Sequence, residues 1–241
     1  MWRSMQPVHL IAVATAGLAI ALAAVAADGD GAAPKGQSSL LDVRRQQPIS
    51  GDAQAGKASS SVCSACHGAN GIGIAPTFPH LAGQSATYLY VQLKTFKDGQ
   101  RNDPVMTPLV ASLGDAEMRN LAAYYASLPA KAGARAASAS PGARLFGDGD
   151  PSRGIPPCQG CHGAGGKGPR SDADVDAAKP RPPWSTIPRL QGQSGAYVAK
   201  ALRDFKSGAR GKTSNAAIMH GVAKSLSDAD IQSLADFIDA H

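Results

Sequence analysis

The chain has 241 residues, with 27 Gly, 17 Pro, 17% charged and 5% aromatic residues, and a formal charge of +6. This length suits one large domain or two small ones, and the Gly and Pro content predicts many loops, which excludes a helical bundle held together only by its own apolar surface. Four cysteines in so long a chain exclude a disulfide scaffold. The basic residues are spread along the chain, which argues against a nucleic-acid partner.

The first 27 residues have the pattern of an export signal. Arg3 supplies a positive start, an apolar run extends from about Leu10 to Ala26, and the small residues of Ala24-Val25-Ala26 precede Asp28. The run is about 18 residues long, which is near the lower limit for a transmembrane helix. We therefore predict a cleaved signal over 1–27 and a periplasmic protein, with an uncleaved membrane anchor as the alternative.

A polar lead follows over residues 28–50. It shows no clear periodicity, so we expect it to be flexible. Behind it, a helix over about 53–65 is predicted to lead into Cys63-Ser-Ala-Cys66-His67.

Two more helices are predicted before residue 129. Ser85 is a good N-cap for one that runs to about Asp98, where Gly99 stops it. The other spans 115–128 and has apolar residues at helical spacing, so Met118 on its apolar face is predicted to lie in the core.

The second part of the chain repeats the first. Cys63–Ala69 returns 95 residues later as Cys158–Ala164, with the same Cys-x-x-Cys-His-Gly-Ala pattern. Residues 51–129 and 142–241 are therefore predicted to be two domains of one kind, joined by a linker over 130–141. In the second domain, Ser227-Asp-Ala-Asp230 resembles a capping box at the start of the last helix.

The offset between matching residues grows along the second copy. It rises from 95 to 109 and then to 113, which places an insertion of 14 residues within 167–185 and one of four near 211–217. The larger insertion contains Pro180-Arg-Pro-Pro183-Trp184. Its role stays open between covering the second site, docking a dedicated partner and forming a tolerated surface loop.

Cys-x-x-Cys-His is the attachment pattern of c-type haem. Two thiols about one helical turn apart can form thioether bonds to one porphyrin, and the histidine that follows reaches the iron. The sequence therefore predicts two covalently bound haem c groups. Their thioether cysteines would be Cys63 and Cys66 in the first copy, and Cys158 and Cys161 in the second, with His67 and His162 as iron ligands.

Other uses of the cysteines fit less well. Cys66 and Cys158 are 92 residues apart, too far for an ordinary zinc site. A thioredoxin-type redox pair needs a strand–helix–strand setting, which is not predicted, and two structural disulfides would leave the histidine after each pair unexplained.

Matched methionines are predicted to provide the second axial ligand for each iron. Met106 and Met219 occupy equivalent positions, and each is predicted to lie in a loop before the last helix of its copy. Thioether ligation opposite a histidine raises the reduction potential and fills the coordination sphere. His220 is the alternative to Met219, while His80, which matches Arg189, is predicted to be a surface residue.

Residues around each site are expected to orient the ligands. The carbonyls of Pro79 and Pro188, in matched turns, are candidates to accept a hydrogen bond from His67 and His162. Arg101 and Arg210 either pair with haem propionates or are plain surface residues.

With these blocks, the chain from about residue 51 to the C-terminus resembles the dihaem cytochrome c4 family. The motifs that carry the resemblance are Cys63–His67, Leu81-Ala-Gly-Gln84, Met106-Thr-Pro108, Gly154-Ile-Pro156, Cys158–His162, Leu190-Gln-Gly-Gln193 and Met219. The resemblance implies an all-α fold of two tandem class I cytochrome c domains, each wrapped around one covalently attached haem. It implies a pseudo-twofold relation, with the propionate edges of the two haems facing each other.

The resemblance also implies a function. Its axial pairs would be His67 with Met106 and His162 with Met219, with no catalytic residues. The protein would be a periplasmic electron carrier, reduced by a quinol-oxidising cytochrome bc complex and oxidised by a terminal haem-copper oxidase. The long lead and the insertion allow an alternative, an electron-transfer subunit of a periplasmic dehydrogenase. A dihaem peroxidase needs an open iron, which a Met for each haem argues against.

Overall fold

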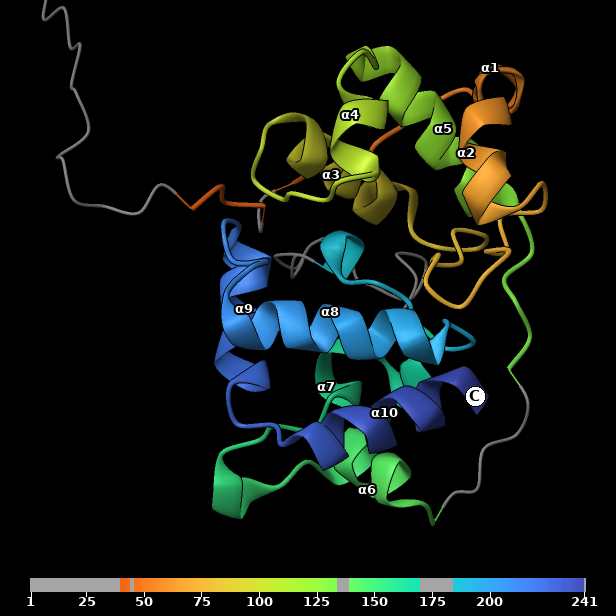
Figure 1. The fold of residues 1–241 in the computed structure, drawn as a ribbon. Helices are drawn as coiled ribbons and strands as arrows, with labels where there is room; N and C mark the ends of the chain where they lie inside the picture. The colour runs from red at the N-terminus through yellow and green to blue at the C-terminus, as the bar shows by residue number, and fades with distance from the viewer. Residues whose placement is uncertain (1–39, 44–45, 134–138, 170–183, 241) are drawn as a thin grey trace, which may run out of the picture. The chain divides into compact units, whose positions relative to one another are not determined.

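The computed structural model describes residues 40–43, 46–133, 139–169 and 184–240. Within these ranges the chain is helical and has two isolated β-bridges but no β-strand (Figure 1). The all-α prediction is confirmed. The described residues do not include the predicted signal or membrane anchor, most of the lead, or most of the larger insertion, of which Trp184 and Ser185 are described. Among the described residues, no helix is long and apolar enough to cross a bilayer.

The first half, residues 51–129, contains five helices. They are α1 (Ala53–Ser59), α2 (Ser61–His67), α3 (Ala86–Lys97), α4 (Met106–Val110) and α5 (Asp115–Ser127). The helices predicted over 85–98 and 115–128 are confirmed, and Ser85 Oγ accepts the amide hydrogen of Tyr88 as an N-cap. The single helix predicted over 53–65 is wrong, because the chain breaks it at Ser60, whose hydroxyl and amide both donate to the carbonyl of Lys57.

The second half, residues 141–240, repeats this plan. Its helices are α6 (Pro141–Asp148), α7 (Gln159–His162), α8 (Gly195–Ser207), α9 (Ser214–Ala223) and α10 (Asp228–Ala240), with short 3₁₀ turns η1 (Pro151–Arg153), η2 (Ala164–Gly166) and η4 (Trp184–Thr186). Helix α6 begins at Pro141, the last residue of the predicted linker.

In each half the first helix crosses the last one at a glycine. Gly56 of α1 lies against the Asn120 carbonyl of α5, and Gly142 of α6 lies against the Ser233 carbonyl of α10. A Cβ atom at either glycine would come within 2.0 Å of that oxygen. The two crossings are equivalent in the repeat, since Asn120 and Ser233 differ by the same 113 residues as the matched methionines.

Each half has its own apolar core. In the first half it gathers α3 and α5 around Leu121 and Met118, each 2% exposed, so the prediction for Met118 is confirmed. In the second half it gathers α6, α8 and α10 around Phe146 and Ile231.

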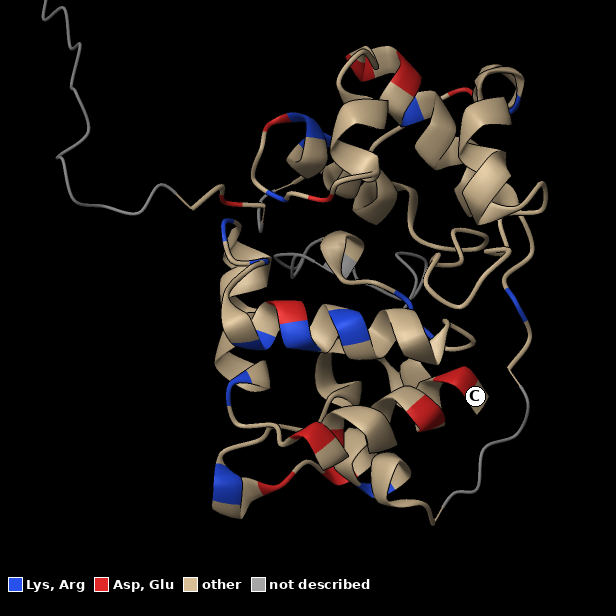
Figure 2. Ribbon diagram, viewed as in Figure 1, with Lys and Arg blue, Asp and Glu red and all other residues tan. Residues whose placement is uncertain are grey.

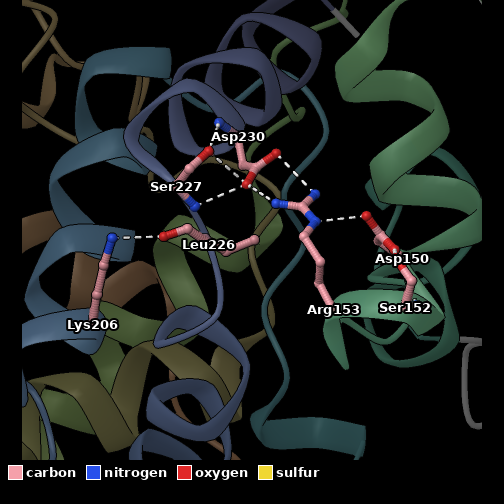
Figure 3. A network of polar contacts seen from close by, with 7 residues as sticks. All are labelled: Asp150, Ser152, Arg153, Lys206, Leu226, Ser227 and Asp230. Carbon is pink, nitrogen blue, oxygen red and sulfur yellow. Dashed lines mark hydrogen bonds and ion pairs between the residues drawn. The ribbon is translucent and has the colours of Figure 1, made fainter.

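The capping box predicted at the start of the last helix is confirmed. Ser227 Oγ accepts the amide hydrogen of Asp230 at 3.1 Å, and the Asp230 carboxylate accepts the amide hydrogen of Ser227 at 2.8 Å. The same carboxylate accepts from Arg153, which also binds Asp150 (Figure 3). This network ties η1 to the start of α10.

Part of the lead is ordered against both halves, so the expectation of a flexible segment over 28–50 is wrong for its described residues. We call residues 40–43 and 46–50 the strap. Leu41 forms a parallel β-bridge with Thr213 of the second half, while Val43, 5% exposed, packs into the core of the first. Further along, the Ile49 amide donates to Thr87 Oγ1 at 3.1 Å.

The strap meets the places where the second copy departs from the first. Its bridge partner Thr213 lies in the four-residue insertion, and the backbone oxygen of Gln46 lies 3.5 Å from the hydroxyl of Ser185 in η4, at the end of the larger insertion. The Ser185 carbonyl accepts from Ser85 Oγ at the N-terminus of α3. The lead and both insertions therefore contribute to one contact region.

Two glutamines join the halves directly. Gln84 Nε2 donates to the Arg189 carbonyl and its Oε1 accepts the Arg189 amide hydrogen, both at 2.9 Å. Gln193 makes the same pair of bonds with His80, at 2.9 and 2.8 Å. Gln84 and Gln193 are equivalent in the repeat, so the bonds are reciprocal, as a pseudo-twofold relation requires.

Candidate functional site

The first Cys pair lies on a short helix. Cys63 and Cys66 are in α2, and His67 is its last residue, because Gly68 follows with φ of 76°, in the left-handed region that favours glycine. Both cysteines are free thiols and partly buried. Burial raises the pKa of the Cys63 thiol.

The second pair lies at a corresponding turn, although its first cysteine stands just before the helix and Cys161 is exposed. Cys158 precedes α7, Cys161 and His162 end it, and Gly163 has φ of 76°. Burial raises the pKa of Cys158 to about 11. No group of three or more His, Cys, Asp or Glu side chains that could hold a bare metal ion occurs in the part of the chain that is described.

Each motif histidine is fixed by a proline carbonyl. His67 Nδ1 lies 2.9 Å from the Pro79 carbonyl oxygen, and His162 Nδ1 lies 2.9 Å from that of Pro188. Since a carbonyl can only accept, Nδ1 carries the proton and Nε2 keeps its lone pair. Burial lowers the pKa of both histidines, which favours the neutral, metal-binding form.

The matched methionines lie on helices, so the prediction that they lie in loops is wrong. Met106 is the first residue of α4, and the Asp103 carboxylate accepts its amide hydrogen at 3.0 Å. Met219 lies within α9 and packs against the same core as Cys158. Met106 begins its helix, whereas Met219 lies in the middle of one. The four-residue insertion explains this, since it adds a turn before Met219, with Thr213 as the N-cap.

The two other histidines have distinct positions. His220 is exposed on α9, and its Nδ1 donates to the Phe205 carbonyl at 2.7 Å. His80 is half-buried between the halves and accepts the Gly73 amide hydrogen at Nδ1, so the prediction of a surface residue is wrong. The repeat had matched it with Arg189, which is also half-buried.

Arg101 and Arg210 both reach the boundary between the halves. Each guanidinium stacks on an aromatic ring of its own half, Phe96 or Phe205, at 4.4 and 4.5 Å from the ring centre. Each also donates to Gln92 Oε1, at 2.8 and 2.7 Å. Arg210 is only 9% exposed.

The arginines cross to the opposite half as well. Arg101 lies 3.4 Å from the Tyr197 hydroxyl, and Arg210 lies 3.3 Å from that of Tyr88. None of the ion pairs among the described residues includes either arginine. The two guanidinium groups share one neutral acceptor, so their positive charge can still bind an anion such as a haem propionate.

The polypeptide also leaves apolar surface uncovered around the motifs. Val62, beside Cys63, and Ile74, whose amide donates to the Cys66 carbonyl, are 62% and 67% exposed. Val105 and Leu109, on either side of Met106, are 47% and 44% exposed. Free thiols, a histidine with a free Nε2 and bare apolar side chains are what a covalently bound porphyrin requires, so the residues present fit the group.

Sequence reasoning missed two residues of this region. Gln92 has no counterpart in the second copy, where Ala201 stands, so the repeat gave no reason to single it out. Asp103 precedes Met106 by three residues, the spacing of a capping side chain, and that signal was available.

A family model described as Cytochrome c matches residues 53–129 and again 139–241. Among curated relatives, cytochrome c4 of Pseudomonas aeruginosa is 39% identical over 78% of this chain and 88% of its own length. Cytochrome c4 of Stutzerimonas stutzeri is 39% identical over 82% of this chain and 93% of its own. A thiosulfate dehydrogenase electron acceptor of Thiomonas intermedia is 37% identical over 74% of this chain and 77% of its own.

Solved structures agree with these relatives. Reduced recombinant cytochrome c4 from Pseudomonas stutzeri matches with a TM-score of 0.69 and 36% identity, over 79% of this chain and 99% of that one. Thiosulfate dehydrogenase from Marichromatium purpuratum matches with a TM-score of 0.65 and 30% identity, over 78% of this chain and 40% of that one.

Proposed function

Because the chain belongs to the dihaem cytochrome c4 family of electron carriers, with two covalently bound haem c groups, we propose that it is a periplasmic carrier between a quinol-oxidising cytochrome bc complex and a terminal haem-copper oxidase. The bound haem supplies a one-electron Fe(II)/Fe(III) couple. The chain's residues attach it, fix the iron ligands and exclude water.

The observation that carries this proposal is the paired arrangement of histidine and methionine. His67 and His162 are held at Nδ1 by proline carbonyls and can present Nε2 to an iron. We assign Met106 and Met219 as the opposite ligands, because they are equivalent in the repeat. The Asp103 carboxylate accepts the amide hydrogen of Met106, and Thr213 caps the helix that carries Met219. Two filled coordination spheres favour electron transfer over chemistry on a bound substrate, and so argue against a peroxidase.

The remaining residues have supporting roles in this assignment. Cys63, Cys66, Cys158 and Cys161 form the thioether bonds, while Pro79 and Pro188 orient the histidines. Arg101 and Arg210 neutralise propionates at the boundary between the halves.

A spectroelectrochemical titration of the purified holoprotein, with carbon monoxide offered to the reduced form, tests the methionine assignment. Two positive-potential haems that ignore carbon monoxide are expected. Met106→Ala and Met219→Ala should each lower one potential and admit carbon monoxide at that haem. Met118→Leu is the control and should change neither, because Met118 lies in the core. A wild-type haem that binds carbon monoxide would contradict the assignment.

A second candidate partner is a periplasmic dehydrogenase. It is favoured by relatives whose names describe thiosulfate dehydrogenase electron acceptors, at 36% and 37% identity. Stopped-flow reduction of the oxidised holoprotein separates the two donors. Faster reduction by a cytochrome bc complex with quinol supports the first proposal, and faster reduction by a thiosulfate dehydrogenase with thiosulfate supports the second.

Export by a cleaved signal is part of the proposal and has its own test. The mass of the mature holoprotein, purified from the periplasmic fraction, should correspond to a chain that starts near Asp28 plus two haems. A membrane-bound protein with the full N-terminus would support the anchor instead.

A further inference from the structure

Two buried nitrogen atoms between the halves lack a hydrogen-bond partner among the described residues. They are Nε2 of His80 and Nε of Arg189. Both side chains line one small cavity, which the linker residue Lys131 and the glutamines Gln84, Gln191 and Gln193 also line. A buried polar group without a partner is costly, so such a pair indicates that something else occupies the cavity.

Both nitrogen atoms are donors. His80 Nδ1 accepts the Gly73 amide hydrogen at 2.9 Å, so in the neutral ring the proton lies on Nε2. Burial lowers the pKa of His80, and the neighbouring Lys131 lowers it further, which favours this neutral form. Arg189 Nε always carries its hydrogen.

The rest of Arg189 is already engaged with neutral groups. Its Nη1 donates to the Lys167 carbonyl at 3.2 Å, and its Nη2 donates to Gln191 Oε1. None of the ion pairs within the described ranges includes this guanidinium. Lys131 adds a second positive charge at the cavity, 3.6 Å from the Asp239 carboxylate. The cavity wall therefore carries a half-buried positive charge without a direct counter-ion.

Two of the three glutamine side-chain oxygens on the cavity wall are in use. Gln84 Oε1 accepts two amide hydrogens, from Ser85 and Arg189. Gln193 Oε1 accepts two, from Ser194 and His80. A water molecule needs acceptors for its own two hydrogens, and of these three oxygens only Gln191 Oε1 has capacity left. An anion needs donors only, and here it finds two, together with positive charge.

The size of the cavity limits the anion. The cavity volume is about 10 Å³, which is room for about one water molecule or one monatomic ion. A monatomic ion therefore suits this space. The position is also notable, because His80 and Arg189 are equivalent in the repeat and each is bound through its backbone to a glutamine of the opposite half.

We propose that this cavity is a binding site for a halide ion, held by His80 Nε2–H and Arg189 Nε–H between the two halves. The ion offsets the charge of Arg189 and joins the halves beside the two glutamine clamps. The proposal depends on the contact between the halves and not on which redox partners the protein has.

Thermal unfolding of the oxidised holoprotein in sodium chloride, sodium bromide or sodium gluconate, at one total ionic strength, tests the proposal. Chloride and bromide should raise Tm relative to gluconate, by about 3–6 °C for each tenfold increase above the dissociation constant. Arg189→Gln and His80→Phe should abolish the difference. Arg203→Gln, on the exposed face of α8, is the matched control and should retain it.

Crystals of the wild-type holoprotein grown with bromide provide a readout that does not depend on a variant folding. An anomalous bromine peak in the cavity is expected, within hydrogen-bond reach of both nitrogen atoms. A water molecule or a haem carboxylate there, or equal stability in halide and gluconate, would overturn the proposal.

Discussion

Replacing Gly142 by alanine probes the crossing of the first and last helices of the second half. The new Cβ would lie 1.9 Å from the Ser233 carbonyl oxygen and 2.9 Å from Phe237 Cβ. Carbon and oxygen atoms in contact lie more than 3 Å apart, so α6 and α10 would have to separate by more than about 1 Å. That movement would also disturb the pair Phe146 and Phe237, whose ring centres are 5.2 Å apart.

The magnitude follows from two opposing effects. Overpacking of this kind costs about 1–3 kcal/mol. Gly142→Ala lies at the upper end of this range, because the atom that its Cβ would meet is a backbone oxygen, which cannot move aside as a side chain can. Alanine is the better helix former by about 1 kcal/mol. We therefore expect Gly142→Ala to lower the free energy of unfolding by about 2 kcal/mol.

Gly147→Ala, in the same helix, is the matched control. Its Cβ would meet nothing closer than 3.7 Å, so only the gain in helix propensity remains, and it should stabilise by up to about 1 kcal/mol. Guanidinium unfolding of the holoprotein followed by far-UV circular dichroism measures both. Equal stability of the two variants would refute the close crossing, and Gly56→Ala should repeat the result in the first half.

Two further predictions concern the capping box and the strap. Asp230→Asn should destabilise by about 1 kcal/mol at pH 7. Hydrogen bonds from Arg153 chiefly hold the pKa of Asp230 well below its usual range. The contribution of this carboxylate to stability is therefore complete above about pH 4, the pKa in the unfolded chain, and is lost as the pH falls through the lower pKa of the folded protein. The difference between Asp230→Asn and wild type in urea titrations should shrink accordingly in acid. Val43→Ala should cost about 2 kcal/mol in the same assay, because Val43 is buried in the core of the first half, whereas Leu40→Ala, at a residue 42% exposed, should change stability by less than about 0.5 kcal/mol. Equal losses at Val43 and Leu40 would contradict the packing of the strap.

Helix starts that depend on a few consecutive residues could be predicted from the sequence. Ser85 and the Ser227–Asp230 box are caps written into a few consecutive residues, and the helices they begin are where the sequence places them. The proline carbonyls were identifiable from the repeat, since Pro79 and Pro188 stand in matched turns of the two copies.

Contacts between distant residues could not be predicted in this way. Leu41 of the strap pairs with Thr213, and nothing around either residue indicates the other. Met219 lies on a helix because the four-residue insertion lengthens that helix at its start. The change in offset shows roughly where the insertion lies, but it does not show which conformation the insertion adopts. Charge gave no further signal for helix α8, because that helix carries both basic and acidic side chains (Figure 2).

The strap has a consequence for the order in which the molecule folds. Val43 donates its amide hydrogen to Ser214 Oγ, 171 residues further along. Closing so long a loop is slow compared with forming helices from neighbouring residues. The side chain of Val43 needs only the first half, in whose core it packs. Its amide and the backbone of Leu41 are paired only when Ser214 and Thr213 are in place, so the strap can complete its hydrogen bonds only after the second half has folded.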